Sequence, residues 1–151
     1  MNDSVLSVDF ETESGSGSCP GYVGLTLGSG VGRYTGLFGL VSDALLTARV
    51  VTADGKVLQV SEKENSDLFW GLRGAGFNFG VVTSATFQAH KLVNQGQVMN
   101  ADLIFPANMS KQYFEVLGSF SGKMSPNLAA VTVIYYNTDA QAVSRSPDIL
   151  T

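Results

Sequence analysis

Two stretches decide the fold of this chain: VGLTLGSGVGRYTGLFGLVSDALL at residues 23–46 and ENSDLFWGLRGAGFNFGVVT at residues 64–83. The chain has 17 Gly in 151 residues, and most of them are crowded between Gly15 and Gly39 and between Gly71 and Gly80. Glycine is the residue that lets a backbone turn sharply or approach a ligand closely. The crowding therefore indicates two loops with exposed backbone rather than general flexibility.

Between the two stretches the sequence predicts a β-hairpin. Residues 46–53 and 56–60 are rich in strand-forming side chains, and Asp54-Gly55 separates them. This dipeptide favours a two-residue type I′ turn, in which both residues have positive φ.

The second stretch predicts a short helix, a loop and a strand. A helix over residues 65–73 would begin at a Ser/Asp cap and end at Gly74. A half-buried strand is expected over residues 81–89, with Val81, Ala85, Phe87 and Ala89 on one side and Ser84, Thr86, Gln88 and His90 on the other. Core positions are expected for the aromatic side chains Phe69, Trp70, Phe77 and Phe79.

The flanks give the domain organisation. Residues 1–18 end in a Ser/Gly run typical of a flexible segment, and the composition changes near Asn94. Beyond that boundary we expect a strand over residues 98–105, a helix over 110–120 and a strand over 129–136, followed by a loose tail over 138–151. The order of elements is α+β rather than a regular alternation of strands and helices.

Composition excludes several classes of function. The chain has 9 Lys and Arg against 13 Asp and Glu and a pI near 4.7, so nucleic acid is not an expected partner. The absence of a membrane-spanning apolar run and of a signal peptide makes the cytoplasm the default location. Cys19 and His90 are the only residues of their types, which excludes a Cys/His zinc site and an internal disulfide. A serine-hydrolase elbow, Gly-x-Ser-x-Gly, is also missing.

The two glycine-rich loops are the part of the sequence that indicates a binding function. Glycine exposes backbone N–H groups that can bind a pyrophosphate without positive charge. The Gly-x-Gly-x-x-Gly fingerprint is not satisfied, however, because Arg33 stands where the third glycine belongs after Gly28 and Gly30, and no Walker A motif follows either loop. Local pattern alone leaves both interpretations open and favours tight turns without a ligand.

Taken together, residues 23–46, the following VVTADG at residues 50–55 and residues 64–83 resemble the second half of the FAD-binding domain of PCMH-type, berberine-bridge-like (vanillyl-alcohol-oxidase-like) flavoproteins. The resemblance covers residues 19–90 in collinear order, and the sequence is most similar to the fungal, secondary-metabolite branch of the family. It implies a partial FAD-binding domain over residues 19–93, a mixed sheet with short helices, followed by the start of an α+β substrate domain over 94–137.

The resemblance also implies a cofactor site for FAD. The Gly turn lies along the flavin and its pyrophosphate in that family, the segment at residues 42–45 packs near the cofactor, and residues 78–82 face the adenine end. The implied cofactor-binding residues are Gly28, Ser29, Gly30, Val31, Gly32, Asp43, Gly80 and Val82. The catalytic residue is not identified, and no metal is expected.

For Cys19 and His90 the sequence leaves two roles open. Several members of the family tether the flavin through a cysteine just before the Gly turn, and Cys19 resembles that position. The register is ambiguous, and a buried structural thiol is the favoured interpretation. For His90, at the polar side of a strand end, a solvated or satisfied imidazole is favoured over catalysis.

The family resemblance implies an FAD-linked oxidoreductase that oxidises a small-molecule substrate, with the flavin reoxidised by oxygen. Residues 1–18 do not resemble the Gly-Gly-His flavin loop of the family, and most of the substrate domain has no counterpart here. The alternative is a truncated, catalytically silent relative or a non-enzymatic binding module. Neither a nucleic acid nor a membrane is an expected partner, whereas unpaired sheet edges would favour self-association.

Overall fold

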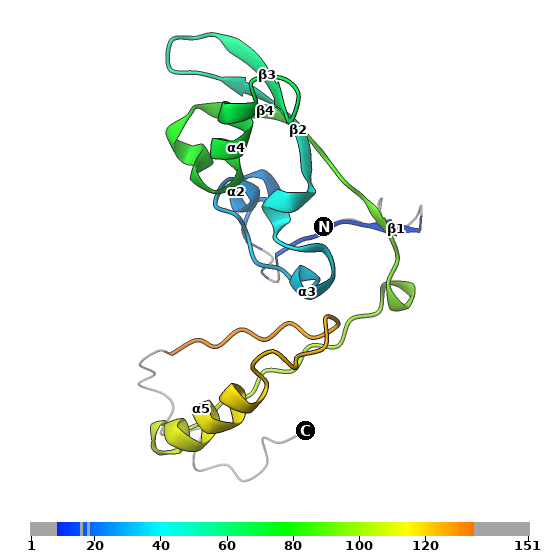
Figure 1. The fold of residues 1–151 in the computed structure, drawn as a ribbon, viewed down its shortest axis with the longest axis vertical. Helices are drawn as coiled ribbons and strands as arrows, with labels where there is room; N and C mark the ends of the chain where they lie inside the picture. The colour runs from blue at the N-terminus through cyan, green and yellow to red at the C-terminus, as the bar shows by residue number, and fades with distance from the viewer. Residues whose placement is uncertain (1–8, 16, 18, 135–151) are drawn as a thin grey trace. The chain divides into compact units, whose positions relative to one another are not determined.

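The computed structural model describes residues 9–15, 17 and 19–134 of the 151-residue chain (Figure 1). The tail expected over residues 138–151, residues 1–8 of the expected flexible segment and residues 135–136 of the last expected strand lie outside the described part. The chain divides into two compact units, one of Met1–Val98 with Pro126–Ala129 and the other of Met99–Ser125 with Ala130–Thr151. The expected boundary between residues 93 and 94 stays a prediction.

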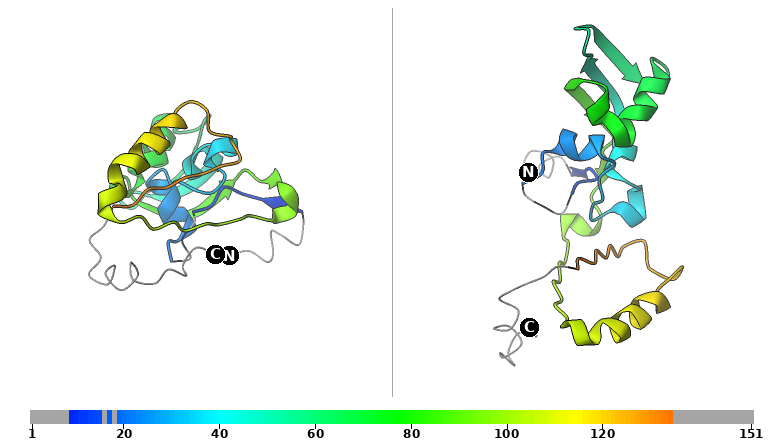
Figure 2. Two further views of the ribbon diagram at one scale, coloured as in Figure 1. Left: turned by 90° about the horizontal axis from the view of Figure 1, so that it is seen from below. Right: turned by 90° about the vertical axis from the view of Figure 1, so that its left-hand side faces the viewer.

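The first unit is built on a three-stranded antiparallel sheet. Its strands are β2 (Leu45–Val51), β3 (Val57–Ser61) and β4 (Val81–Phe87), in the order β3-β2-β4. Helix α4 (Ser66–Ala75) packs against this sheet and against helix α2 (Tyr22–Leu27), as Figures 1 and 2 show. The buried core joins these elements through Leu27, Leu45, Ala48, Val50, Val60, Phe69 and Leu72.

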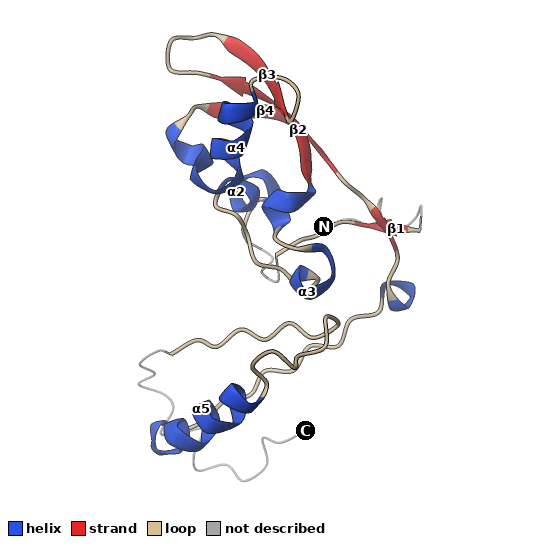
Figure 3. Cartoon of the chain, viewed as in Figure 1, coloured by secondary structure: helices blue, strands red, loops and turns tan. Residues whose placement is uncertain are grey.

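The predicted α+β class is therefore confirmed, but the sheet is not mixed. Every strand pair in the described part of the chain is antiparallel. Among the described residues, strands, red in Figure 3, form this sheet and a short ribbon of β1 (Phe10–Glu11) with β5 (His90–Lys91).

The predicted hairpin is confirmed, whereas its turn type is wrong. Val51 pairs with Val57, and the Thr52 N–H donates to the Lys56 carbonyl at 2.9 Å, which leaves a three-residue connection. Gly55 has a φ of 77°, and Asp54 is not among the residues with positive φ. A three-residue connection ending in a left-handed glycine is a type I turn followed by a glycine bulge.

Helix α4 forms where the second stretch predicts it, but its cap differs. Asn65 precedes the helix with a φ of 48° and no side-chain cap, because its Nδ2 donates instead to the Gln59 carbonyl at 2.7 Å. The helical backbone breaks at Arg73 and Gly74, as the glycine predicts.

Only one of the four aromatic side chains expected in the core lies there. Phe69 is 2% exposed, whereas Trp70 is 77% and Phe77 70% exposed, and Phe79 packs on Gly71 while remaining partly exposed. Consecutive residues of a helix point about 100° apart, so a helix that buries Phe69 and Leu72 on the sheet turns Trp70 away from it.

Strand β4 is confirmed, but a β-bulge changes which of its side chains face the core. Val50 pairs with Val82 while Arg49 pairs with Ser84, so one extra residue is accommodated at Thr83. Val82 consequently packs on the core and Val81 is 67% exposed. The expected placement of Val81 on the side of Ala85 and Phe87 is wrong, because a bulge shifts the alternation by one residue.

The segment with linker composition carries structure in its described part. Phe10 pairs with Lys91 and Glu11 with His90, and an isolated bridge joins Gly15 to Gly32. Two short elements follow α2, helix α3 (Thr35–Phe38) and the 3₁₀ turn η1 (Val41–Ala44). Two further 3₁₀ turns lie at η2 (Gly76–Asn78) and η3 (Asn94–Gly96).

In the second unit, helix α5 (Ser110–Ser119) follows the turn η4 (Ala107–Met109) and confirms the helix expected at residues 110–120. The expected strands do not form: residues 98–105 and the described residues 129–134 have no strand pairing. Side chains of this unit such as Leu103, Ile104 and Val131 are exposed. These residues favour strands, but among the described residues they have neither a partner strand nor a core to pack on. No helix in the described residues is long and apolar enough to cross a membrane.

Candidate functional site

The turn at residues 28–32 is the end of helix α2. The N–H groups of Gly28 and Ser29 donate to the carbonyls of Leu25 and Thr26, each at 3.1 Å. Ser29 and Gly30 then both adopt a φ of 74°. Left-handed residues after the last helical turn let the final N–H groups bond back to the helix, which ends α2.

Two backbone hydrogen bonds join this turn to η1. Val41 donates to the Gly30 carbonyl at 3.0 Å and Ser42 to the Ser29 carbonyl at 2.8 Å. Asp43, which the resemblance places at the cofactor, uses its Oδ2 to accept the Leu40 N–H at 2.8 Å. The carboxylate therefore caps η1 beside the turn.

The turn is tightly packed at its two inner glycines. A Cβ built at Gly30 would lie 2.8 Å from the Val41 Cβ and 2.9 Å from the Leu25 Cγ. A Cβ at Gly32 would meet the Ser14 carbonyl and the Glu13 carboxyl group. Both glycines are thus required by the packing of the chain itself.

Sequence reasoning missed Thr35, which holds the end of the turn. Its Oγ1 accepts the Gly32 N–H at 2.9 Å and lies 2.9 Å from the Gly32 carbonyl. A Thr three residues after a glycine is the only local signal for such a side-chain turn.

The two glycine-rich segments lie against each other. A Cβ at Gly74 would lie 3.0 Å from the Ser29 Oγ, and one at Gly28 would lie 3.6 Å from the Phe77 ring. The fold therefore brings together loops about 45 residues apart in the chain, which the sequence places in two separate stretches.

Gly80 and Val82 lie elsewhere. A Cβ at Gly80 would meet the carbonyl of Val51, at the far end of β2 from η1, and Val82 pairs with Val50. Strand β2 has 7 residues, and these two predicted contacts lie at the end of β2 that is opposite η1.

Three hydrogen-bond donors at the turn are not used by the described part of the chain. The N–H groups of Gly30 and Val31 donate to none of its acceptors, and Val31 is 58% exposed. The Arg33 Nε is buried without an acceptor there. An unpaired buried donor is costly, and an anion at the turn would satisfy it. Backbone N–H groups and a guanidinium are donors of the kind that bind a pyrophosphate, whereas the N–H groups of Gly28 and Ser29 already donate to carbonyls of α2.

Cys19 and His90 lie outside this donor set. Cys19 is exposed, so the expectation of a buried thiol is wrong. The His90 ring is half-buried and stacks on the Phe38 ring, with centroids 3.9 Å apart and the planes 2° from parallel. The described residues contain no group of His, Cys, Asp and Glu that could hold a metal ion.

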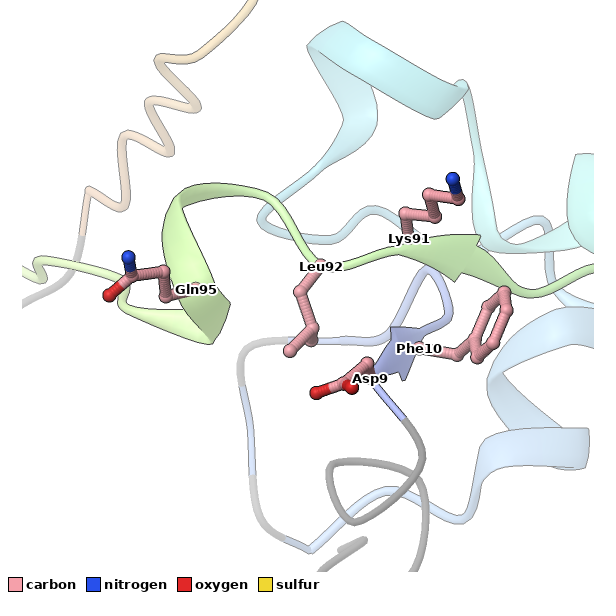
Figure 4. Close-up of a pocket in the computed structure, with 5 residues that line it drawn as sticks. All are labelled: Asp9, Phe10, Lys91, Leu92 and Gln95. Carbon is pink, nitrogen blue, oxygen red and sulfur yellow. The ribbon is translucent and has the colours of Figure 1, made fainter.

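A hollow elsewhere in the first unit is shallow. Asp9, Phe10, Lys91, Leu92 and Gln95 line it beside the β1–β5 ribbon (Figure 4). It holds no convergent set of polar groups, so the turn at residues 28–32 remains the candidate site.

No family model matches the chain. Individual relatives do: the FAD-linked oxidoreductase fogF of Aspergillus ruber is 52% identical over 143 residues, which are 93% of this chain. The FAD-linked oxidoreductase OXR1 of Pyricularia oryzae is 52% identical over 128 residues, or 85% of the chain. This chain is homologous to part of the fungal FAD-linked oxidoreductases. It spans 29% of the length of fogF and 25% of OXR1.

Solved structures point to the same group of flavoproteins. The chain resembles 6-hydroxy-D-nicotine oxidase from Arthrobacter nicotinovorans, with a TM-score of 0.56 and 41% identity over 58% of this chain and 19% of that one. Glucooligosaccharide oxidase from Acremonium strictum, which carries a 6-S-cysteinyl, 8α-N1-histidyl FAD, matches with a TM-score of 0.51 and 39% identity over 55% of this chain and 18% of that one. The resemblance that the two stretches indicated is thus confirmed.

Proposed function

We propose that this chain contributes the glycine turn of an FAD site, as part of an FAD-linked oxidoreductase that acts on a small molecule. The observation that carries the proposal is the 52% identity to fogF over 93% of the chain, because this match spans both glycine-rich segments. The donors at the turn that find no acceptor in the described part of the chain supply an independent physical reason.

Each donor has a distinct role in the proposed site. The Gly30 and Val31 N–H groups would donate to the pyrophosphate, and Arg33 would add the positive charge that an acidic chain otherwise lacks. Ser29, Gly32 and Asp43 act by shaping the turn: each is tied by hydrogen bonds or packing to η1 or to residues 13–14. Gly80 and Val82 remain proposed main-chain contacts for the far end of the cofactor.

FAD bound in this way supplies a group that accepts a hydride from an alcohol or amine carbon and is reoxidised by oxygen. The residues of this chain contribute binding and orientation to that chemistry. None of the described side chains is placed as a catalytic base. The substrate is proposed only as a small molecule, in line with the names of the relatives.

Titration of the purified chain with FAD tests the proposal, with flavin fluorescence as the readout and riboflavin, which lacks the pyrophosphate, as the matched ligand. We expect saturable FAD binding that riboflavin does not reproduce. Equal affinity for the two ligands, or no binding of either, would contradict the assignment of the turn to a pyrophosphate.

Denaturation of the FAD complex tests the role of Cys19. We expect acid to release all of the flavin, because the position of Cys19 relative to the Gly turn does not match the tethering cysteine unambiguously. Flavin that stays with the denatured chain, and is lost in Cys19→Ser, would establish a covalent link instead.

A further inference from the structure

An acidic segment at residues 9–15, named here the acidic strap, lies across the first unit. Besides the pairing of β1 with β5, the Thr12 Oγ1 donates to the Gln88 carbonyl at 2.9 Å and lies 2.9 Å from the Tyr22 hydroxyl. The Glu11 Oε1 accepts the Val93 N–H at 2.8 Å. Polar contacts thus dominate the docking of the strap.

Glu13 is the most deeply buried residue of the strap. It is 0% exposed, and its carboxyl group lies against Gly32 and 3.3 Å from the Thr35 Oγ1. Its Oε2 accepts no hydrogen bond from the described part of the chain. A buried carboxylate needs a cation or several donors. Among the described residues Glu13 forms no ion pair, and the hydrogen bonds from the Thr35 hydroxyl and the Tyr34 backbone do not outweigh the effect of burial.

The groups that face Glu13 offset its negative charge only in part. Glu11 adds a second negative charge from the strap. Helix α2 and the start of α3 present the hydroxyls of Tyr22, Thr35 and Tyr34 and the backbone of Tyr34. Burial raises the pKa of Glu13 to about 7, and burial likewise raises the pKa of Tyr22, so that this tyrosine stays neutral near neutral pH. Across the ribbon, His90 pairs with Glu11 and Lys91 with Phe10.

We propose that the acidic strap docks onto the turn at residues 28–32 with Glu13 protonated, and that ionisation of Glu13 releases the strap. A protonated carboxyl can share its hydrogen with the Thr35 hydroxyl, and the second oxygen then carries no charge that needs a donor. Gly15, at the end of the strap, forms an isolated β-bridge with Gly32. Release of the strap therefore exposes the side of the turn that packs against Glu13 and Ser14.

The direction in which pH changes docking follows from the pKa of Glu13 in the docked strap and in the released strap. Glu13 has its ordinary pKa near 4.5 when the strap is released and a raised pKa of about 7 when it is docked. The docked strap therefore holds more protons between these values, so docking is strongest below pH 4.5, weakens as pH rises and is weakest above about 7.

Hydrogen exchange of the full chain measures docking directly. The reporters are the amides of Leu92 and Val93, which donate to the Asp9 carbonyl and the Glu11 side chain. The Thr52 amide in the β2–β3 hairpin serves as an internal control. We expect the protection factors of the reporters, corrected for intrinsic exchange, to fall at least about tenfold between pH 5.5 and 8.0, while that of Thr52 stays constant.

Two variants identify the group responsible. Glu13→Gln keeps the shape without a titrating proton, so its reporters should show no change in protection over this pH range. Glu64→Gln removes an exposed carboxylate away from the strap and should behave as the wild type. Constant or absent protection in the wild type would overturn the proposal, and so would a pH dependence that persists in Glu13→Gln, which would point to Glu11 or His90.

Discussion

At the scale of single residues, both the fold and the proposed FAD site require a glycine at position 30. Its φ of 74° is a conformation that residues with a Cβ adopt only at a cost, and Val41 and Leu25 fill the space a side chain would need. A loss of FAD binding in Gly30→Val would therefore report loss of structure as well as loss of a ligand contact.

We predict that Gly30→Ala lowers the free energy of unfolding by about 2 to 4 kcal/mol, from the left-handed backbone and the overpacking together. Urea denaturation followed by circular dichroism measures this difference. Gly24→Ala is the matched control, because Gly24 lies in α2 with nothing within 4 Å of its would-be Cβ. It should be neutral or stabilise by up to about 1 kcal/mol. Equal stability of the two variants would show that the turn is not packed as described.

How far the sequence predicts the site can be judged at the same scale. The glycine turn was predicted through a resemblance of sequence, and in the described residues the N–H groups of Gly30 and Val31 find no acceptor. Glu13 and Thr35 were not predicted as neighbours of Gly32. Glu13 is 19 residues from Gly32 in the chain and comes from a segment with linker composition, so no local pattern indicates that contact.

At the scale of elements, local chemistry predicts some parts and not others. Asp54-Gly55 predicts the hairpin because the turn is a local property of the chain, although the three-residue loop could be recognised only from the pairing of Val51 with Val57. Helix α2 was not predicted: it has 6 residues, a glycine inside and no side-chain cap, so its propensity is low and packing on α4 supports it.

The outer strands of the sheet suggest a specific association. In the described part of the chain β3 and β4 are both edge strands, and each exposes a valine, Val57 at 61% and Val81 at 67%. We predict concentration-dependent self-association through these edges, because an unpaired apolar edge favours pairing with another chain. Sedimentation velocity over a range of concentrations measures it.

A charged edge should prevent that association. The double variant Val57→Lys, Val81→Lys places lysines on both edges, and it should stay monomeric where the wild type associates. Asp67→Lys, an exposed change on α4, controls for the gain of positive charge. Association that is unaffected by the edge lysines would assign it to another surface, such as the exposed Trp70.

At the scale of the whole molecule, the chain matches 29% of the length of fogF, and no described residue is placed as a catalytic base. Catalysis by a flavin requires a substrate held at the reactive ring within about 1 Å of the productive position. We therefore predict FAD binding by this chain without substantial turnover. Stopped-flow reduction of the FAD complex by candidate alcohols, compared with free FAD, measures it, and a rate well above that of free FAD would contradict the prediction.

The central claim is that main-chain N–H groups of the turn bind the pyrophosphate of FAD, and one pair of variants tests it most directly. Val31→Pro removes the Val31 N–H, whereas Val31→Ala keeps it and removes only an exposed side chain. A hydrogen bond to a charged group is worth about 1.5 to 3 kcal/mol, so the Kd for FAD should rise about 10- to 100-fold in Val31→Pro and stay near the wild-type value in Val31→Ala. Unchanged affinity in Val31→Pro, with a wild-type circular dichroism spectrum, would contradict the claim.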